Sequence, residues 1–125
     1  MASVIEAEGF VVKDARGVVR ARLGLVGDEQ EYAGLSLYDQ QGQSRILIST
    51  AGAGNYDRAT VLIKDSSGTF RAKLDVVNGV SYLLLSDAGE VPRVRLACDS
   101  AGGTLVEVLK ADGSVAFSTR QEPDA

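Results

Sequence analysis

A short sequence frame recurs along this chain and limits what it can fold into. In the frame, Asp is followed three residues later by Gly and six residues later by Arg, within segments where apolar and polar residues alternate. The units recur about every 24 residues, and they span about residues 8–26, 33–50, 59–77, 81–98 and 104–120. Because each repeat normally forms one supersecondary unit, the sequence predicts a single domain, residues 1–125, built from five similar units.

Each unit is typical of an antiparallel β-hairpin closed by its Asp-x-x-Gly segment. An Asp at the first turn position bonds the backbone two residues later, and a Gly at the fourth accepts a left-handed conformation without steric cost. The predicted turn residues are Asp14, Gly17, Asp39, Gly42, Asp65, Gly68, Asp87, Gly89 and Gly113. The fourth unit has its glycine one position early, and the fifth has Lys110 in place of Asp and Ala116 in place of Arg. Terminal repeats often depart from the pattern in this way because they cap a stack.

Two loop lengths fit this turn: three residues with a glycine bulge, or four residues. A slip of one residue exchanges the two faces of a strand, so the apolar pattern favours one of them. With four residues, Asp14 lies opposite Val19 and Val12 opposite Ala21, and the apolar side chains gather on one face. We therefore predict the four-residue loop. The same register joins Leu35 and Leu37 with Ile46 and Ile48, Val61 and Ile63 with Ala72 and Leu74, and Leu83 and Leu85 with Val94 and Leu96.

The opposite face of the predicted sheet is mixed in character. It carries a ladder formed by Arg20, Arg45, Arg71 and Arg93, together with Arg22, Lys73 and Arg95. Val11, Leu47, Leu62 and Leu84 point to the same side. A sheet with one solvated face rarely presents so many aliphatic side chains, so this face either packs on a partner or is covered by Arg stems. We expect a homo-oligomer, which would also protect the two open edges of the sheet.

The predicted fold class is all-β, with five tandem antiparallel hairpins and about ten strands. We expect these hairpins to associate into an oligomeric β-prism or stalk-like assembly, with a homotrimer favoured. An up-and-down β-barrel is the alternative. A single-chain solenoid fits less well, because its rungs prefer constant length and the connections here, at about 27–34, 51–59, 77–80 and 99–103, differ in length.

Composition argues against enzymatic and nucleic-acid-binding functions. The chain has no His, which removes the usual general base and the commonest metal ligand. Its net charge is −4 and its basic residues are dispersed, so no continuous positive surface is expected for a run of phosphates. The repeated Asp and Arg are assigned structural roles, because catalysis needs a residue once whereas a turn needs it in every hairpin. We expect no enzymatic activity, no catalytic residue, no cofactor and no metal.

Three further features receive structural interpretations. The segment 51–55, Ala-Gly-Ala-Gly-Asn, lies in a connection rather than between a strand and a helix, so we interpret it as a flexible loop and not a nucleotide site. The carboxylates Asp28, Glu29 and Glu31 are interpreted as a solvated acidic loop rather than a Ca²⁺ site, since no EF-hand or calcium β-roll pattern surrounds them. Cys98 continues an apolar alternation and is predicted to be a small buried hydrophobic residue.

The N-terminal segment has no basic start, and it has no apolar run long enough for a signal peptide or a membrane span. We expect a cytoplasmic location by default and no membrane partner. A phage particle or a leaderless export route would give the same sequence features.

The frame from Phe10 to Leu23 resembles that of bacterial proteins with tandem Asp-x-x-Gly-x-x-Arg-Ala-x-Leu hairpins, most of them of unassigned function. The resemblance covers about residues 5–120 and implies the repeat but no catalytic or ligand-binding residue; Lys110 and Ala116 depart from it. We expect a non-enzymatic structural or interaction module that self-associates through its hairpins. The alternative is a carrier of a small apolar ligand with a cavity inside a β-barrel.

Overall fold

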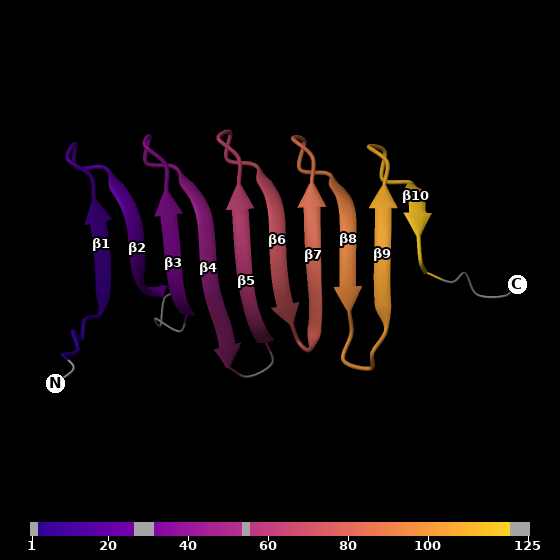
Figure 1. Ribbon diagram of the computed structural model, residues 1–125, viewed down its shortest axis with the longest axis horizontal. Helices are drawn as coiled ribbons and strands as arrows, with labels where there is room; N and C mark the ends of the chain where they lie inside the picture. The colour runs from indigo at the N-terminus through magenta and orange to yellow at the C-terminus, as the bar shows by residue number, and fades with distance from the viewer. Residues whose placement is uncertain (1–2, 27–31, 54–55, 121–125) are drawn as a thin grey trace, which may run out of the picture.

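The computed structural model describes residues 3–26, 32–53 and 56–120 of the chain, and it places ten strands in one antiparallel sheet in chain order (Figure 1). The strands are β1 (Gly9–Lys13), β2 (Val19–Val26), β3 (Tyr32–Tyr38), β4 (Ser44–Ala53), β5 (Tyr56–Lys64), β6 (Phe70–Val77), β7 (Val80–Ser86), β8 (Pro92–Cys98), β9 (Thr104–Leu109) and β10 (Val115–Ser118). The described residues contain no helix. The prediction of an all-β fold made of five tandem hairpins is confirmed.

The sheet is open and consists of a single layer. β1 and β10 lie at its opposite ends, and in the described residues each strand contacts only its neighbours in sequence (Figure 1). The alternative of an up-and-down barrel is therefore wrong, because closure would pair β1 with β10. A solenoid also does not fit, since within residues 3–26, 32–53 and 56–120 no second layer lies over the first.

Along the strands, the register follows the predicted pairing. Phe10 lies opposite Leu23 and Val12 opposite Ala21 in the first hairpin. The apolar pairs predicted for the second, third and fourth hairpins are also present. This agreement arises because the side-chain period of a strand is two, so only one register keeps all apolar residues on one face.

The turn itself is shorter than predicted. The backbone N–H of Asp14 donates to the carbonyl of Val18 at 2.9 Å, and Lys13 rather than Asp14 lies opposite Val19. The loop therefore has three residues, and the predicted four-residue loop is wrong. A β-bulge between Val12 and Lys13 then shifts the register by one residue. The bulge recurs in all five hairpins, and it supplies the residue that the loop lacks, which is why the strand register was still predicted correctly.

At the strand ends away from the Asp-x-x-Gly turns, two connections predicted as loops are more regular. Val77 pairs with Val80 around Asn78 and Gly79, whose φ angles of 50° and 82° are typical of a type I′ hairpin turn. Most of the connection predicted at 51–59 is strand, since it lies in β4 and β5.

Asp99 forms a turn of the same kind as Asp14, Asp39, Asp65 and Asp87, but it joins the strands at their other ends. Its carboxylate accepts hydrogen bonds from the backbone amides of Ala101 and Gly103 at 2.9 and 2.7 Å. The sequence Asp99-Ser-Ala-Gly102 has the turn spacing, but it lacks the Arg six residues after the Asp, so it was interpreted only as a connection.

The sheet buries almost no apolar side chain. Among the described residues, Leu109 is the one buried apolar side chain, 7% exposed, whereas Leu74 and Phe117 are each 55% exposed. The accessible surface of the chain is 9037 Å², against roughly 6,400 Å² expected for a compact monomer of its mass. A single layer has no interior, because an apolar sheet face is buried only when a second layer covers it.

Candidate interaction surfaces

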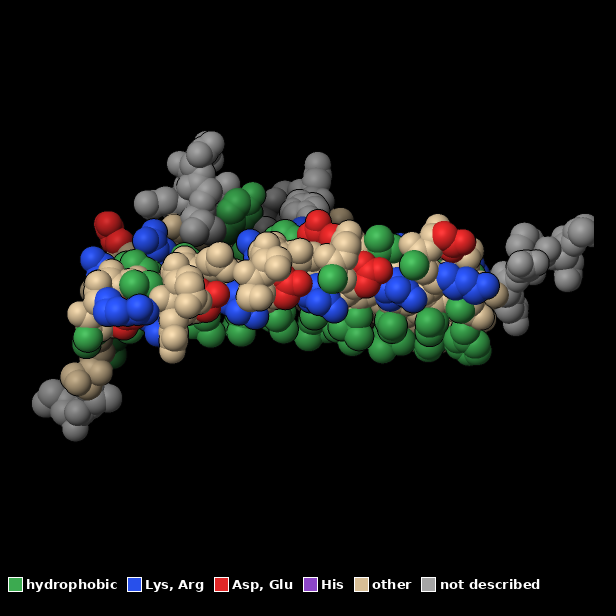
Figure 2. All heavy atoms as spheres, turned by 90° about the horizontal axis from the view of Figure 1, so that it is seen from above, with side chains coloured by type: hydrophobic (Ala, Val, Ile, Leu, Met, Phe, Trp, Pro, Cys, Tyr) green, Lys and Arg blue, Asp and Glu red, His purple; other side chains and the backbone are tan. Residues whose placement is uncertain are grey.

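One face of the sheet is apolar from β1 to β10. Cross-strand partners share a face, so the register arranges the side chains in rows that cross the strands. One row consists of Val12, Ala21, Leu37, Ile46, Ile63, Ala72, Leu85, Val94, Val108 and Phe117. The adjacent row consists of Phe10, Leu23, Leu35, Ile48, Val61, Leu74, Leu83, Leu96 and Val106. We call these two rows the apolar face; Figure 2 shows hydrophobic side chains gathered along one side of the sheet.

The apolar face is accessible and carries no charged residue in either row. Ile48 and Leu74, near its middle, are 42% and 55% exposed. A depression of about 400 Å³ lies over β6 to β9, with Leu74 and Val106 in its lining. Cys98 lies opposite Ser81 in the next row and is exposed. The prediction that Cys98 is buried is wrong for this single layer, which has nothing to cover the thiol.

The other face combines charged, polar and aliphatic side chains, and we call it the mixed face. Its middle row consists of Val11, Arg22, Ser36, Leu47, Leu62, Lys73, Leu84, Arg95, Glu107 and Ser118. Leu47, Leu62 and Leu84 lie in this row, as the pattern of the sequence predicts. Their side chains are half-buried there. A depression of about 260 Å³ lies over this face, with Leu62, Leu84 and Arg58 in its lining.

A buried carboxylate organises the centre of the mixed face. The side chain of Asp75 has no exposed surface, and Arg58 holds it with two hydrogen bonds, of 3.1 Å to Oδ1 and 2.8 Å to Oδ2. The Tyr82 hydroxyl donates to Oδ2 at 2.9 Å, and the Lys73 ammonium lies 3.4 Å from the same oxygen. Burial alone would raise the pKa of Asp75, but the hydrogen bonds from Arg58 and Tyr82 and the nearby cations lower it below its ordinary value of 3.8.

The sequence did not reveal this cluster. Asp75 follows the third unit's Arg by four residues and has no counterpart in the frame, so nothing in the repeat marks it. Its partners come from β5, β6 and β7, and only the register brings Tyr82 opposite Asp75. A polar residue in the middle of an otherwise apolar segment, Leu74-Asp75-Val76, was the one available signal.

The Arg ladder joins each hairpin to the next one. The Nε of Arg45 donates to the carbonyl of Lys64, the residue before the turn of the following hairpin, at 2.8 Å. Its Nη1 lies 3.6 Å from the carboxylate of Asp39, in the turn of its own hairpin. Arg20, Arg71 and Arg93 repeat the first contact with the carbonyls of Tyr38, Ser86 and Leu109, at 3.1, 2.8 and 2.8 Å. They repeat the second contact with Asp14, Asp65 and Asp87, at 3.8, 3.4 and 3.4 Å.

We call each of these two-part contacts an Arg staple. The ion pairs lie within one hairpin and not between the Asp turns of adjacent hairpins; the link to the next hairpin is the hydrogen bond to its backbone. Each such bond satisfies a carbonyl just beyond the last pair of the ladder between two hairpins, as Tyr38 follows the pair Ala21 and Leu37.

The turn carboxylates are held by backbone amides. Oδ1 of Asp39 accepts from the N–H groups of Gln41 and Gln43, at 2.9 and 3.0 Å. The bond from Gln43 is the main cause that lowers the pKa of Asp39 below its ordinary value of 3.8, and Arg45 lowers it further. In the fourth hairpin, the amide of Val91 has the same effect on the pKa of Asp87.

The left-handed turn position is occupied by Gly17, Gly42, Gly68 and Gly113 in four of the five hairpins, with φ angles of 79° to 87°. In the fourth hairpin it is occupied by Glu90, with φ of 65°. The early glycine, Gly89, does not take over this role; its amide donates to Asp87. Gly89 lies in the turn, as predicted, but Glu90 takes the left-handed position that glycine holds in the other hairpins.

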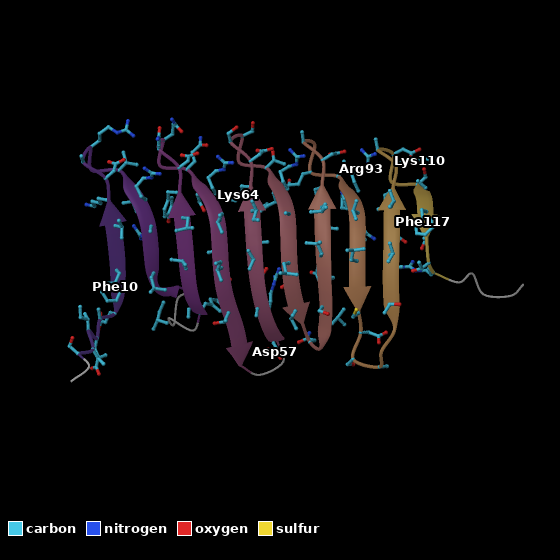
Figure 3. The ribbon with its side chains drawn as sticks, in the orientation of Figure 1. Phe10, Asp57, Lys64, Arg93, Lys110 and Phe117 are labelled. Carbon is cyan, nitrogen blue, oxygen red and sulfur yellow. The ribbon has the colours of Figure 1, made fainter. Side chains whose placement is uncertain are left out.

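The fifth hairpin keeps the turn without its Asp and its Arg. The N–H of Lys110 donates to the carbonyl of Ser114 at 2.8 Å, as in the other hairpins, while Asp112 accepts from Ser114 instead. Ala116 cannot form an Arg staple, and in the described residues no hairpin follows β10 to receive one. Figure 3 labels Arg93, which forms the last staple, and Lys110 at the turn edge of the sheet.

The described residues contain no group of three or more metal-ligating side chains, and no helix long and apolar enough to cross a membrane. The predicted acidic loop, Asp28, Glu29 and Glu31, lies outside these residues. Gly54 and Asn55 also lie outside them, whereas residues 51–53 belong to β4.

No protein-family model matches the chain, and a search of curated proteins finds no match. The resemblance to bacterial hairpin-repeat proteins therefore stays a prediction from the frame residues.

Proposed function

We propose that this protein is a non-enzymatic structural module that self-associates through its apolar face, with copies of the same chain covering that face. The observation that carries the proposal is the pair of aliphatic rows that crosses the single-layered sheet. Apolar patches of this extent are rare on monomeric proteins and mark interaction surfaces. Leu109 as the one buried apolar side chain of the described residues means that the isolated sheet lacks the burial that stabilises a fold.

The apolar face is two rows of side chains wide, and this width is compatible with three copies around one axis. Facing sheets pack about 10 Å apart, so each wall of a filled three-sided prism stands about 5 Å from the axis and is about 17 Å wide. Five strand residues span that width, at about 3.4 Å each. A strand of five residues presents two or three side chains to one face, as β1 does with Phe10 and Val12.

The area is sufficient for a stable assembly. Ten strands at about 4.8 Å spacing make a wall about 45 Å long, so each chain contributes about 800 Å² of wall. This equals the roughly 800 Å² per partner of a standard stable interface. The depression over β6 to β9 would receive side chains of a neighbouring wall. Two sheets packed face to face as a sandwich would cover the same apolar face. The mass of the assembly distinguishes this sandwich of two chains from the prism of three.

Sedimentation velocity and native mass spectrometry on the full chain at micromolar concentration test the proposal. We expect a species of three times 13.1 kDa, with a thermal midpoint that rises with protein concentration because dissociation accompanies unfolding. A mass of two chains would replace the prism by a sandwich. A folded monomer at all concentrations would contradict self-association itself.

A further inference from the structure

The two edges of the sheet differ in a way that the apolar face does not explain. In the described residues, the outer sides of β1 and β10 have no neighbouring strand. All five residues of β1 are exposed, and Phe10, Val11 and Val12 are 45%, 50% and 57% exposed. An exposed apolar edge strand is a template for pairing with another strand.

Lys13 holds the same place in the first hairpin as the four residues that receive an Arg staple. Those residues, Tyr38, Lys64, Ser86 and Leu109, each precede the turn of their hairpin, and their carbonyls point back to the preceding hairpin. By the same repeat geometry, the carbonyl of Lys13 points away from β2, toward the outside of the sheet. The β1 edge therefore presents an acceptor of the kind that an Arg staple uses.

The β10 edge lacks the matching donor. The position six residues after the turn's first residue is Ala116, and the first residue is Lys110, so neither half of a staple can form. β10 is also the shortest strand, with four residues. A second copy of this chain therefore cannot continue the sheet by placing its β10 beside β1 with a staple.

We propose that the β1 edge is a docking edge for a β-hairpin of another polypeptide that keeps the complete Asp-x-x-Gly-x-x-Arg frame. That hairpin would add its second strand antiparallel to β1, and its Arg would donate to the carbonyl of Lys13. Addition of such hairpins is directional, because the β10 edge lacks the Asp and the Arg of a staple. In a prism, the three β1 edges lie at one end, so the partner would attach at that end only.

A donor made from this chain tests the proposal. Lys110→Asp with Ala116→Arg restores the frame in the fifth hairpin, and Val11→Pro removes an outward N–H from the donor's own β1, so the donor cannot polymerise. The triple variant is added to the wild-type chain, and the mass of the assembly is measured by sedimentation. The matched control is Val11→Pro alone.

We expect the triple variant to double the mass of the wild-type assembly and the control to leave it unchanged. Exchange of chains through the apolar face would not change the mass. The mass of the wild-type chain alone reports the proposed self-association, and the increase on mixing reports docking, so the two failures are distinguishable. A triple variant that is folded by circular dichroism and leaves the mass unchanged would overturn the proposal. So would a control whose own assembly has half the wild-type mass, because β1 would then pair with a second β1.

If the triple variant does not fold, the variant with Lys110→Asp and Ala116→Arg alone decides the question. It carries both donor and acceptor edges, so we expect open-ended polymers that Val11→Pro abolishes. A discrete assembly of wild-type size would overturn the proposal.

Discussion

Glu90 adopts a backbone conformation that the other hairpins assign to glycine. Its φ of 65° places its Cβ in the left-handed region, which costs an L-residue about 1–2 kcal/mol. Its carboxylate accepts from the Phe70 amide at 3.4 Å, a long contact that offsets little of this cost.

We expect Glu90→Gly to stabilise the protein by about 0.5–1 kcal/mol, because relief of strain exceeds the entropy that glycine adds to the unfolded chain. Urea unfolding checks this. The reverse change, Gly68→Ala, should destabilise by a similar amount, since Gly68 has φ of 84° and open space around a Cβ. Loss of stability in Glu90→Gly would show that the contact with Phe70 outweighs the strain.

Asp75 neutralises two cations at the centre of the mixed face. Removing it leaves Arg58 and Lys73 without their shared carboxylate, and their side chains are 24% and 27% exposed. We expect Asp75→Ala to cost about 2–3 kcal/mol, somewhat less than for a fully buried pair, because water reaches both cations. Urea unfolding measures the loss. The control is Asp57→Ala, which removes an exposed carboxylate at the strand ends away from the Asp turns (Figure 3). It should change stability by less than about 0.5 kcal/mol. Equal effects of the two variants would contradict the role given to Asp75.

The hairpins are held to one another at their turn edge by the Arg staples. Each staple adds one charge-assisted hydrogen bond across two hairpins to the backbone ladder. The pattern explains why Arg recurs at a fixed distance from Asp: the same guanidinium must reach its own turn and the next hairpin. Lys has no planar fork that serves two acceptors in this way.

We expect Arg45→Met to lower the free energy of unfolding by about 1 kcal/mol while the stem remains packed. Arg22→Met is the matched control, because Arg22 is exposed on the same face and forms no staple; it should have almost no effect. Thermal unfolding and hydrogen exchange of the amides in β4 and β5 measure the difference. Equal exchange in both variants would mean that the staple does not couple the hairpins.

The turn carboxylates predict sensitivity to acid. The pKa values of Asp39 and Asp87 are lowered in the folded state, so the unfolded state binds more protons near pH 4. Their contribution to stability is complete above the unfolded pKa of about 3.9 and is lost as the pH falls through the folded pKa. We expect the thermal midpoint to decrease once the pH drops below about 4. The decrease should be smaller in the double variant Asp39→Asn/Asp87→Asn. An unchanged slope in that variant would assign the acid sensitivity to other carboxylates.

At the scale of the whole molecule, the described residues form one sheet without a second layer, and the stability of this sheet should depend on what covers the apolar face. Leu35 and Ser36 are adjacent in β3 and point to opposite faces. We expect Leu35→Lys to dissociate the assembly, because a charge buried between walls loses its hydration. Ser36→Lys, on the mixed face, should leave the mass unchanged. Sedimentation separates the two outcomes, and an assembly that survives Leu35→Lys but not Ser36→Lys would place the interface on the mixed face.

The sequence by itself determined the hairpins and the apolar face. Periodicity of two, repeated in every unit, leaves one register that keeps Val12, Ala21 and their counterparts together, and this holds whatever the turn does in detail. The turn was predicted one residue too long, because a three-residue loop with a bulge and a four-residue loop give the same strand pairing. Such compensation between neighbouring irregularities leaves no trace in an apolar pattern.

Only the tertiary structure decided which polar side chains meet and whether the sheet closes. The Asp75 cluster draws on three strands, and the Arg staples bond backbone carbonyls, which no residue type marks. Whether the sheet stays open depends on how the two end strands, β1 and β10, are placed by the pairing of all ten strands, which local sequence does not specify. That openness leaves the apolar face uncovered, because no part of the described chain returns over it.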